Sequence, residues 1–127
     1  MSKVPILENL QEKFKLYWGM NPNTKAVYPW DSTIVEWNKF MISVEKIGDD
    51  HVGNVHISTV FLGTNHSNEY GPPVLFETMS FSEVYEYDEY QERYYTYEEA
   101  LAGHKRIVEQ VTNGIPLIER KTLKIKF

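Results

Sequence analysis

The segment from 51 to 95 constrains the fold most, because three runs of strand-like residues are separated there by short polar links. In the first run, over 51–62, alternate side chains point to opposite sides, and both sides are mainly apolar toward its end, which predicts a central strand. Further strands are predicted over 74–81 and 91–95. Since short links join successive strands, the pattern favours an antiparallel meander.

A well-specified helix follows these strands. Thr96 is the predicted N-cap and Glu99 its capping-box partner, while Asn113-Gly114 provides a C-terminal stop. Between these signals an apolar stripe at helical spacing runs through Ala100 or Leu101, His104, Ile107 or Val108, and Val111. We therefore expect the helix to lay this stripe on the sheet.

The first third of the chain is less regular. Helical spacing of apolar residues predicts a helix over about 6–18, and the prolines and asparagines of 20–30 indicate a loop. A second helix is expected over 31–40, with Thr33 and Glu36 as a capping box, followed by a strand over 42–47. An earlier start of that strand is the competing interpretation. The residues Gly48-Asp49-Asp50 are then expected to end the strand and reverse the chain.

Together these elements predict an α+β fold of two layers, in which helices pack on one face of an antiparallel meander of three to five strands. The length of 127 residues fits one domain, 1–127. Within it, residues 1–30 form an N-terminal helix and loop, and residues 31–113 form the α+β core. Residues 114–127 form a tail that could add an edge strand.

Composition excludes several classes of function. The chain has no cysteine, which rules out disulfides, thiolate zinc sites and cysteine nucleophiles. Its net charge is −5 without a concentrated basic patch, so direct nucleic-acid binding is not expected. No apolar run reaches the roughly 18 residues of a membrane span, and the N-terminus lacks a signal-peptide pattern. Phosphate-binding glycine motifs and the serine-nucleophile motif are absent. We therefore expect a cytoplasmic protein without a cofactor.

Two ionisable residues fall where apolar ones are expected. Glu77 shares a strand face with Leu75 and Met79, and His104 lies on the apolar stripe of the final helix. A buried carboxylate is costly unless it is paired, so Glu77 is either exposed or paired with Arg93 or His104. If the final helix packs on the face of Leu75 and Met79, Glu77 and His104 meet between the layers. For His104 alone, the favoured interpretation is a histidine at the edge of or within the core whose ring nitrogens have hydrogen-bond partners.

His66, in the polar loop over 63–73, could add a second imidazole to Glu77 and His104. Such a set binds zinc or iron and leaves positions open for substrate. No HExxH-type spacing supports it, so a metal-assisted hydrolase is an alternative hypothesis. A second alternative is a small-ligand pocket between sheet and helix, lined by Arg93, Glu77 and His104, without chemistry.

Tyrosines and acidic residues alternate between Glu83 and Tyr97, and the tyrosines include Tyr85, Tyr87 and Tyr90. The favoured interpretation is a solvated loop whose tyrosines partly pack on the sheet. As a functional surface, the tyrosines would supply contact area. The neighbouring carboxylates would then prefer a basic partner, or would imitate nucleic-acid phosphates toward a DNA-binding enzyme.

The blocks VHISTVFLGTNH, GPPVLFETMSF and ERYYTYEEALAGHKRIVEQV, in this order, resemble a group of small proteins encoded by tailed bacteriophages and prophages. The resemblance covers roughly Trp37 to Val111. It departs from the group's pattern at Asn65, where aspartate is expected, and at Tyr97, where tryptophan is expected. The change at Asn65 weakens the idea of an Asp–His pair with His66. The resemblance implies a phage or phage-like origin and expression in a bacterial cytoplasm, and it implies no catalytic residue.

The leading hypothesis is therefore a non-enzymatic accessory protein of phage type that binds a protein factor of the host or the phage. Its contacts would be Tyr85, Tyr87 and Tyr90, and no metal or other cofactor is expected. Exposed aromatic residues and the C-terminal tail leave self-association open.

Overall fold

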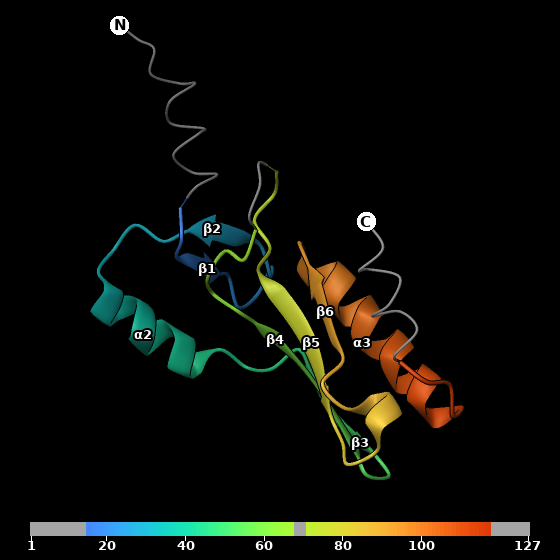
Figure 1. The fold of residues 1–127 in the computed structure, drawn as a ribbon. Coiled ribbons are helices and arrows are strands. Elements are labelled where there is room, and N and C mark those ends of the chain that lie inside the picture. The colour runs from blue at the N-terminus through green and yellow to red at the C-terminus, as the bar shows by residue number, and fades with distance from the viewer. Residues whose placement is uncertain (1–14, 68–70, 118–127) are drawn as a thin grey trace, which may run out of the picture.

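The computed structural model describes residues 15–67 and 71–117. These two ranges contain a small sheet of two strands, a larger sheet of four strands, and two helices (Figure 1). In chain order the elements are β1 (Trp18–Met20), β2 (Val27–Pro29), α2 (Ile34–Ser43), β3 (Gly48–Val52), β4 (Val55–Phe61), β5 (Phe76–Phe81), the 3₁₀ turn η1 (Tyr85–Tyr87), β6 (Gln91–Tyr94) and α3 (Tyr97–Thr112).

The larger sheet is an antiparallel meander, with the strands in the order β3-β4-β5-β6. The predicted α+β fold is therefore confirmed, and so is the central position of β4, which pairs with β3 on one side and β5 on the other. Helix α3 packs across all four strands of this sheet (Figure 1).

The two faces of the larger sheet differ. In β4, the side chains of Val55, Ile57, Thr59 and Phe61 are buried and those between them are half-buried. Since Thr59 hydrogen-bonds His104 of α3, the buried set faces the helix and the alternate set faces away from it. We call the side toward α3 the covered face and the opposite side the outer face.

A polar band crosses the covered face and divides its hydrophobic core into two clusters. One cluster contains Phe61 and Phe76, and the other contains Ile57 and Ile107. Between the clusters lie four buried polar residues, from three strands and the helix: Thr59 of β4, Thr78 of β5, Glu92 of β6 and His104 of α3. The sheet and the helix therefore meet through polar as well as apolar contacts.

Helix α3 begins and ends where the sequence predicts. Thr96 Oγ1 accepts a hydrogen bond from the Glu99 amide, and Glu99 Oε1 accepts one from the Thr96 amide, both at 3.1 Å. Gly114, with φ +74°, follows the C-cap residue. A Cβ atom at Gly103 would lie 2.5 Å from a ring carbon of Tyr94, so the glycine allows β6 to approach the helix closely.

The β3–β4 hairpin corrects two predictions. The strand predicted over 42–47 is wrong, because α2 continues to Ser43 and the expected chain reversal at 48–50 is instead the start of β3. The single strand predicted over 51–62 is two strands, which are joined by the turn at Gly53-Asn54, where Gly53 has φ +60°. Gly48 suits β3 because a Cβ atom there would lie 2.5 Å from the ring of His104.

Helix α2 lies on the opposite side of the larger sheet from α3 (Figure 1). Phe40 and Met41 of α2 pack against the cluster that contains Phe61, and Trp37 Nε1 donates to the carbonyl oxygen of Trp18 at 3.0 Å. Thr33 is the N-cap, as predicted. Helix α2 therefore contacts the core beside Phe61, whereas α3 crosses the covered face of all four strands.

The predictions for the two ends of the chain are tested only in part. Residues 1–14 and 118–127 lie outside the described ranges, and with them most of the predicted N-terminal helix and of the tail. Trp18, predicted as helical, belongs to β1, and β2 lies within the range predicted as a loop. Leu117 is buried, and its amide donates to the carbonyl oxygen of Glu86 at 3.1 Å.

Candidate functional site

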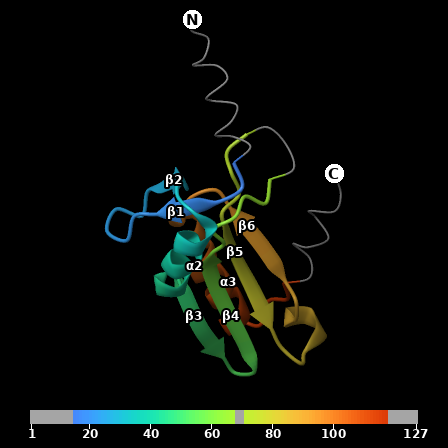
Figure 2. The same cartoon turned by 90° about the vertical axis from the view of Figure 1, so that its left-hand side faces the viewer.

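The outer face of the larger sheet is uncovered at the end formed by the β3–β4 hairpin. Figure 2 looks onto this face and shows α2 over the other end. Strand alternation and register bring four side chains together on the uncovered part: Asp49 and His51 of β3, His56 of β4 and Phe81 of β5. Their neighbours in the same strands, such as Asp50, point to the covered face.

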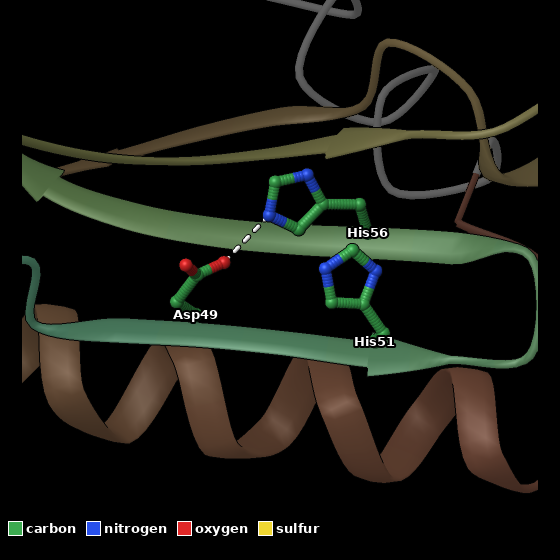
Figure 3. Close-up of side chains that lie close together, drawn as sticks. All are labelled: Asp49, His51 and His56. Carbon is green, nitrogen blue, oxygen red and sulfur yellow. Dashed lines mark hydrogen bonds and ion pairs between the residues drawn. The ribbon is translucent and has the colours of Figure 1, made fainter.

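Asp49, His51 and His56 form the tightest group of potential metal ligands on this face (Figure 3). His51 and His56 are directly opposite each other in the hairpin, and their rings stack with centroids 4.3 Å apart and planes 7° apart. The distance from Asp49 Oδ1 to His56 Nε2 is 2.6 Å. One ligand atom from each residue lies within 4.8 Å of the other two, and no other such group occurs in 15–67 and 71–117.

Asp49 is held as a carboxylate by its neighbours. The hydrogen bond with His56 is the main cause that lowers the pKa of Asp49. The ammonium group of Lys46, whose Nζ lies 3.4 Å from Oδ2, acts in the same direction. Both carboxylate oxygens of Asp49 therefore already contact a nitrogen that can carry positive charge.

Apolar and acidic side chains continue beyond the end of β5. Phe81, whose ring centroid lies 5.7 Å from that of His56, is 45% exposed, and Tyr85 in η1 is 75% exposed. Val84 is exposed as well, and so are the neighbouring carboxylates of Glu83 and Glu86. We call these five residues, from Phe81 to Glu86, the acidic aromatic surface.

Acidic residues outnumber basic ones in the part of the chain that forms this end of the sheet. No lysine or arginine occurs between Lys46 and Arg93, an interval that supplies β3, β4, β5 and η1. Asp49 and Asp50 lie at its start, and most of its other acidic residues lie between Glu77 and Glu92. The field at the hairpin end therefore attracts cations and basic protein surfaces.

Of the three tyrosines predicted as contacts, only Tyr85 is an exposed side chain. Tyr90 is 1% exposed, and its hydroxyl donates to Glu92 Oε2 at 2.9 Å within the covered face. Tyr87 is half-buried and packs against the cluster that contains Ile57. The side chain of Tyr90 is therefore part of the core, and of the three tyrosines only Tyr85 presents a largely exposed ring.

The predicted meeting of Glu77 and His104 does not occur. Thr78, the next residue of β5, lies on the covered face with its Oγ1 atom 2.5 Å from that of Thr59, so Glu77 points to the outer face. There Arg93, directly opposite on β6, donates from Nε to Glu77 Oε2 at 3.0 Å. Of the alternatives for Glu77, pairing with Arg93 is the one that the structure shows.

The other predicted site residues are also separated from one another. His66 is exposed in its loop, where Nε2 lies 3.0 Å from the hydroxyl oxygen of Thr64. With Glu77 and His104 on opposite faces of the sheet, the three residues do not form a metal-ligand group. An open depression between β6 and α3 is lined by Arg93 but by neither Glu77 nor His104.

Asp50, His104 and Thr59 form a hydrogen-bonded series whose order matches that of a catalytic triad. Asp50 Oδ2 lies 2.6 Å from His104 Nε2, and His104 Nδ1 lies 2.6 Å from Thr59 Oγ1. Thr59, whose hydroxyl takes the position of the nucleophile, is fully buried. The member of the series that is exposed is Asp50. Because substrate cannot reach Thr59, the series links β3 and β4 to α3 rather than forming an active site.

The polar band continues to a buried carboxylate. The hydroxyl oxygen of Tyr94 lies 2.9 Å from both Thr78 Oγ1 and Glu92 Oε1, and Arg106 donates to the same carboxylate. Burial acts to raise the pKa of Glu92, but the hydrogen bonds from Arg106 and the tyrosines outweigh it, so the pKa is lowered. Burial raises the pKa of Tyr94 strongly. This part of the band is an ion pair that fastens β6 to α3.

The group of Asp49, His51 and His56 was not among the residues selected from the sequence. Its signal was the two-residue link Gly53-Asn54 between Val52 and Val55, which is typical of a tight hairpin. That register places His51 opposite His56 and brings Asp49 to the same face. The prediction of a single strand over 51–62 left no turn at Gly53-Asn54, so it did not place His51 opposite His56.

Among the described residues, no helix combines the length and apolar character that crossing a bilayer requires. Comparisons of the chain with protein-family models, with curated proteins and with solved structures found no match.

Proposed function

We propose that the protein is a non-enzymatic binding protein, and that the acidic aromatic surface docks a basic protein partner. The observation that carries this proposal is the exposure of Tyr85, at 75%, close in the chain to the exposed Phe81 and Val84. Large aromatic side chains supply much of the contact energy in protein interfaces. Here they follow one another along the chain from the end of β5, and Phe81 lies next to His56 of the hairpin.

Charge defines the kind of partner. Glu83 and Glu86 flank Val84 and Tyr85, and no lysine or arginine between Lys46 and Arg93 offsets them. Complementary potentials accelerate encounter and exclude partners of like charge. A partner surface with lysine or arginine around an apolar depression fits this arrangement, and an acidic one does not.

The polar groups of the covered face support a binding role over an enzymatic one. The triad-like series ends in the buried hydroxyl of Thr59, and Glu92 is occupied by Arg106 and two tyrosines. The metal-assisted hydrolase based on His66, Glu77 and His104 loses its support, because Glu77 and His104 lie on opposite faces. The ligand pocket predicted from Arg93, Glu77 and His104 loses its support for the same reason.

The resemblance of Trp37–Val111 to small tailed-phage proteins suggests where the partner comes from, namely the bacterial host or the phage. In this proposal the protein is a phage-type accessory protein, it acts in the cytoplasm of a bacterium, and its partner is a host or phage factor. Self-association of the chain remains a separate prediction, which a mass measurement in solution decides.

The test compares two exposed tyrosines at opposite ends of the sheet. Tyr85→Ala removes the proposed contact, whereas Tyr95→Ala removes a 47% exposed tyrosine beside the β6 residue that pairs with Phe76, at the far end of β5. Proteins retained from bacterial lysate by the full chain are purified. Their dissociation constants for the wild type and for both variants are then measured directly.

We expect Tyr85→Ala to weaken at least one purified basic partner about tenfold or more, and Tyr95→Ala to leave its affinity unchanged. The association rate should fall as salt rises, because charge steers the encounter. If no purified protein binds, or if those that bind have no basic surface or are insensitive to Tyr85→Ala, the proposal is wrong.

A further inference from the structure

We propose that Asp49, His51 and His56 form a binding site for a divalent transition-metal ion, with Zn²⁺ as the best fit. The site does not depend on the protein-binding role proposed above, because none of the three residues belongs to the acidic aromatic surface. Two imidazole nitrogens and one carboxylate oxygen are a ligand set that binds zinc and its neighbours in the first transition row. Since the chain has no cysteine, thiolates offer no competing ligand.

The hairpin fixes the spacing of the three ligands. The two-residue turn at Gly53-Asn54 sets the register that places His51 directly across from His56. Asp49, two residues before His51 in β3, then lies on the same outer face and reaches His56 at 2.6 Å. A backbone that holds three donor atoms within 4.8 Å loses little chain entropy when an ion binds.

Binding requires only side-chain rotation. Ligand atoms of a tetrahedral zinc site lie about 3.3 Å apart, so Asp49 and His56 must separate slightly to admit an ion. The two rings must also turn from their parallel stack, since the nitrogen lone pairs lie in the ring planes. Asp49 and His51 are exposed and the side chain of His56 is 30% exposed, so solvent is available for these rotations.

The charges nearby favour a cation in this place. His56 Nε2 lies 2.6 Å from Asp49 Oδ1, and an ion between them would take the place of the proton that they share. The carboxylate of Asp50 in the same strand is 54% exposed and adds negative potential from the other side of β3. Lys46 opposes binding, but it contacts Oδ2 of Asp49 and leaves Oδ1 on the side of the histidines.

The ligand set also predicts selectivity. Mg²⁺ and Ca²⁺ prefer sites made of oxygen alone, so they should bind far more weakly than Zn²⁺, Cu²⁺ or Ni²⁺. Three protein ligands leave at least one coordination position of zinc open to water or to a donor atom of another molecule. The site lies on an uncovered face, which gives such a molecule access.

The competing explanation is purely structural: a stacked histidine pair and an Asp–His ion pair that stabilise the hairpin. Calorimetric titration of the untagged full chain, freed of metal with a chelator, separates the two. Zinc is titrated into the wild type, His51→Ala, Asp49→Asn and the control His66→Ala, which removes an exposed histidine outside the group. Thermal unfolding of each variant without metal confirms that it is folded.

The site predicts one zinc ion per chain, a loss of affinity of tenfold or more in His51→Ala and in Asp49→Asn, and unchanged affinity in His66→Ala. Magnesium should give no measurable heat at the same concentration. With Co²⁺ in place of zinc, the visible absorption spectrum of the wild type should show nitrogen and oxygen ligands and should disappear in His51→Ala. Absence of zinc binding in the wild type, or binding that persists in both site variants, overturns the proposal.

Discussion

Replacing the buried Glu92 by glutamine should destabilise the protein by about 2–3 kcal/mol at pH 7. The carboxylate accepts hydrogen bonds from Tyr90 and Tyr94, each at 2.9 Å, and from Arg106. Glutamine has nearly the same size but only one acceptor oxygen, and its amide nitrogen would face these donors. Removing one member of a buried ion pair costs about 3–5 kcal/mol, and the smaller value expected here reflects the 39% exposure of the Arg106 side chain.

The same pair predicts a pH dependence. Because the pKa of Glu92 is lowered in the folded protein, its contribution is fully present above the ordinary pKa of glutamate. The contribution should begin to fall near about pH 4.5 and should continue to fall below it as the folded protein takes up the proton. The difference in unfolding free energy between the wild type and Glu92→Gln should therefore be constant from pH 7 to pH 5 and smaller at pH 3.5.

Urea denaturation at these three pH values measures this difference, with Glu89→Gln as a control that neutralises an exposed carboxylate of the same segment. The reasoning is refuted if Glu92→Gln lies within about 0.5 kcal/mol of the wild type at pH 7, the range of an ordinary surface change. A difference that is the same at pH 7 and pH 3.5 would refute the role of charge even if the protein were destabilised.

Three further changes test the packing around the candidate site. Gly103→Ala should lower the urea midpoint, because the new Cβ meets the ring of Tyr94, and a midpoint at or above that of the wild type would contradict this close approach. Glu77→Ala should cost about 1–3 kcal/mol in the same assay, because the carboxylate is buried while its partner Arg93 is partly exposed; a loss within about 0.5 kcal/mol of zero would contradict the pairing. Tyr85→Ala should change stability by less than about 0.5 kcal/mol, whereas Tyr90→Ala should cost about 3–5 kcal/mol, and equal effects would contradict their assignment to surface and core.

Local signals in the sequence were sufficient for the elements that depend on neighbouring residues. The capping box of Thr96 and Glu99 and the stop at Asn113-Gly114 bound α3 because these groups satisfy backbone atoms within one turn. The alternation in β4 was equally local. The start of β3 was not a local feature. Gly48 lies in this strand because the ring of His104, a residue far along the chain, occupies the space that a Cβ atom would need.

The predicted site depended on which face of the sheet each strand residue points to. The face assigned to Glu77 decided whether it could meet His104. Glu77 and Thr78 are adjacent, and the sequence pattern favoured the face of Glu77 as the one under the helix because Leu75 and Met79 flank it. In the structure the helix covers the face of Thr78, where the buried threonines are satisfied by His104 and Tyr94. Polar residues that bond to one another across a core carry no hydrophobic signal, so periodicity could not identify this face.

The two proposals place a cation site and a protein contact side by side at the uncovered end of the sheet. His56 of the metal site contacts Phe81 of the acidic aromatic surface, with ring centroids 5.7 Å apart. A bound zinc ion would offset part of the negative charge that attracts a basic partner. The affinity for such a partner should therefore be lower with zinc than without it, which measurements in zinc and in chelator would compare.

We propose that the hairpin end of the outer face binds a metal ion and a protein partner. Anomalous diffraction at the zinc absorption edge, from crystals grown with an equimolar amount of zinc, tests it most directly. We expect one strong peak within bonding distance of Asp49, His51 and His56 on the side of the sheet away from α3. A peak at His66 alone, or no peak near the hairpin, would contradict the account.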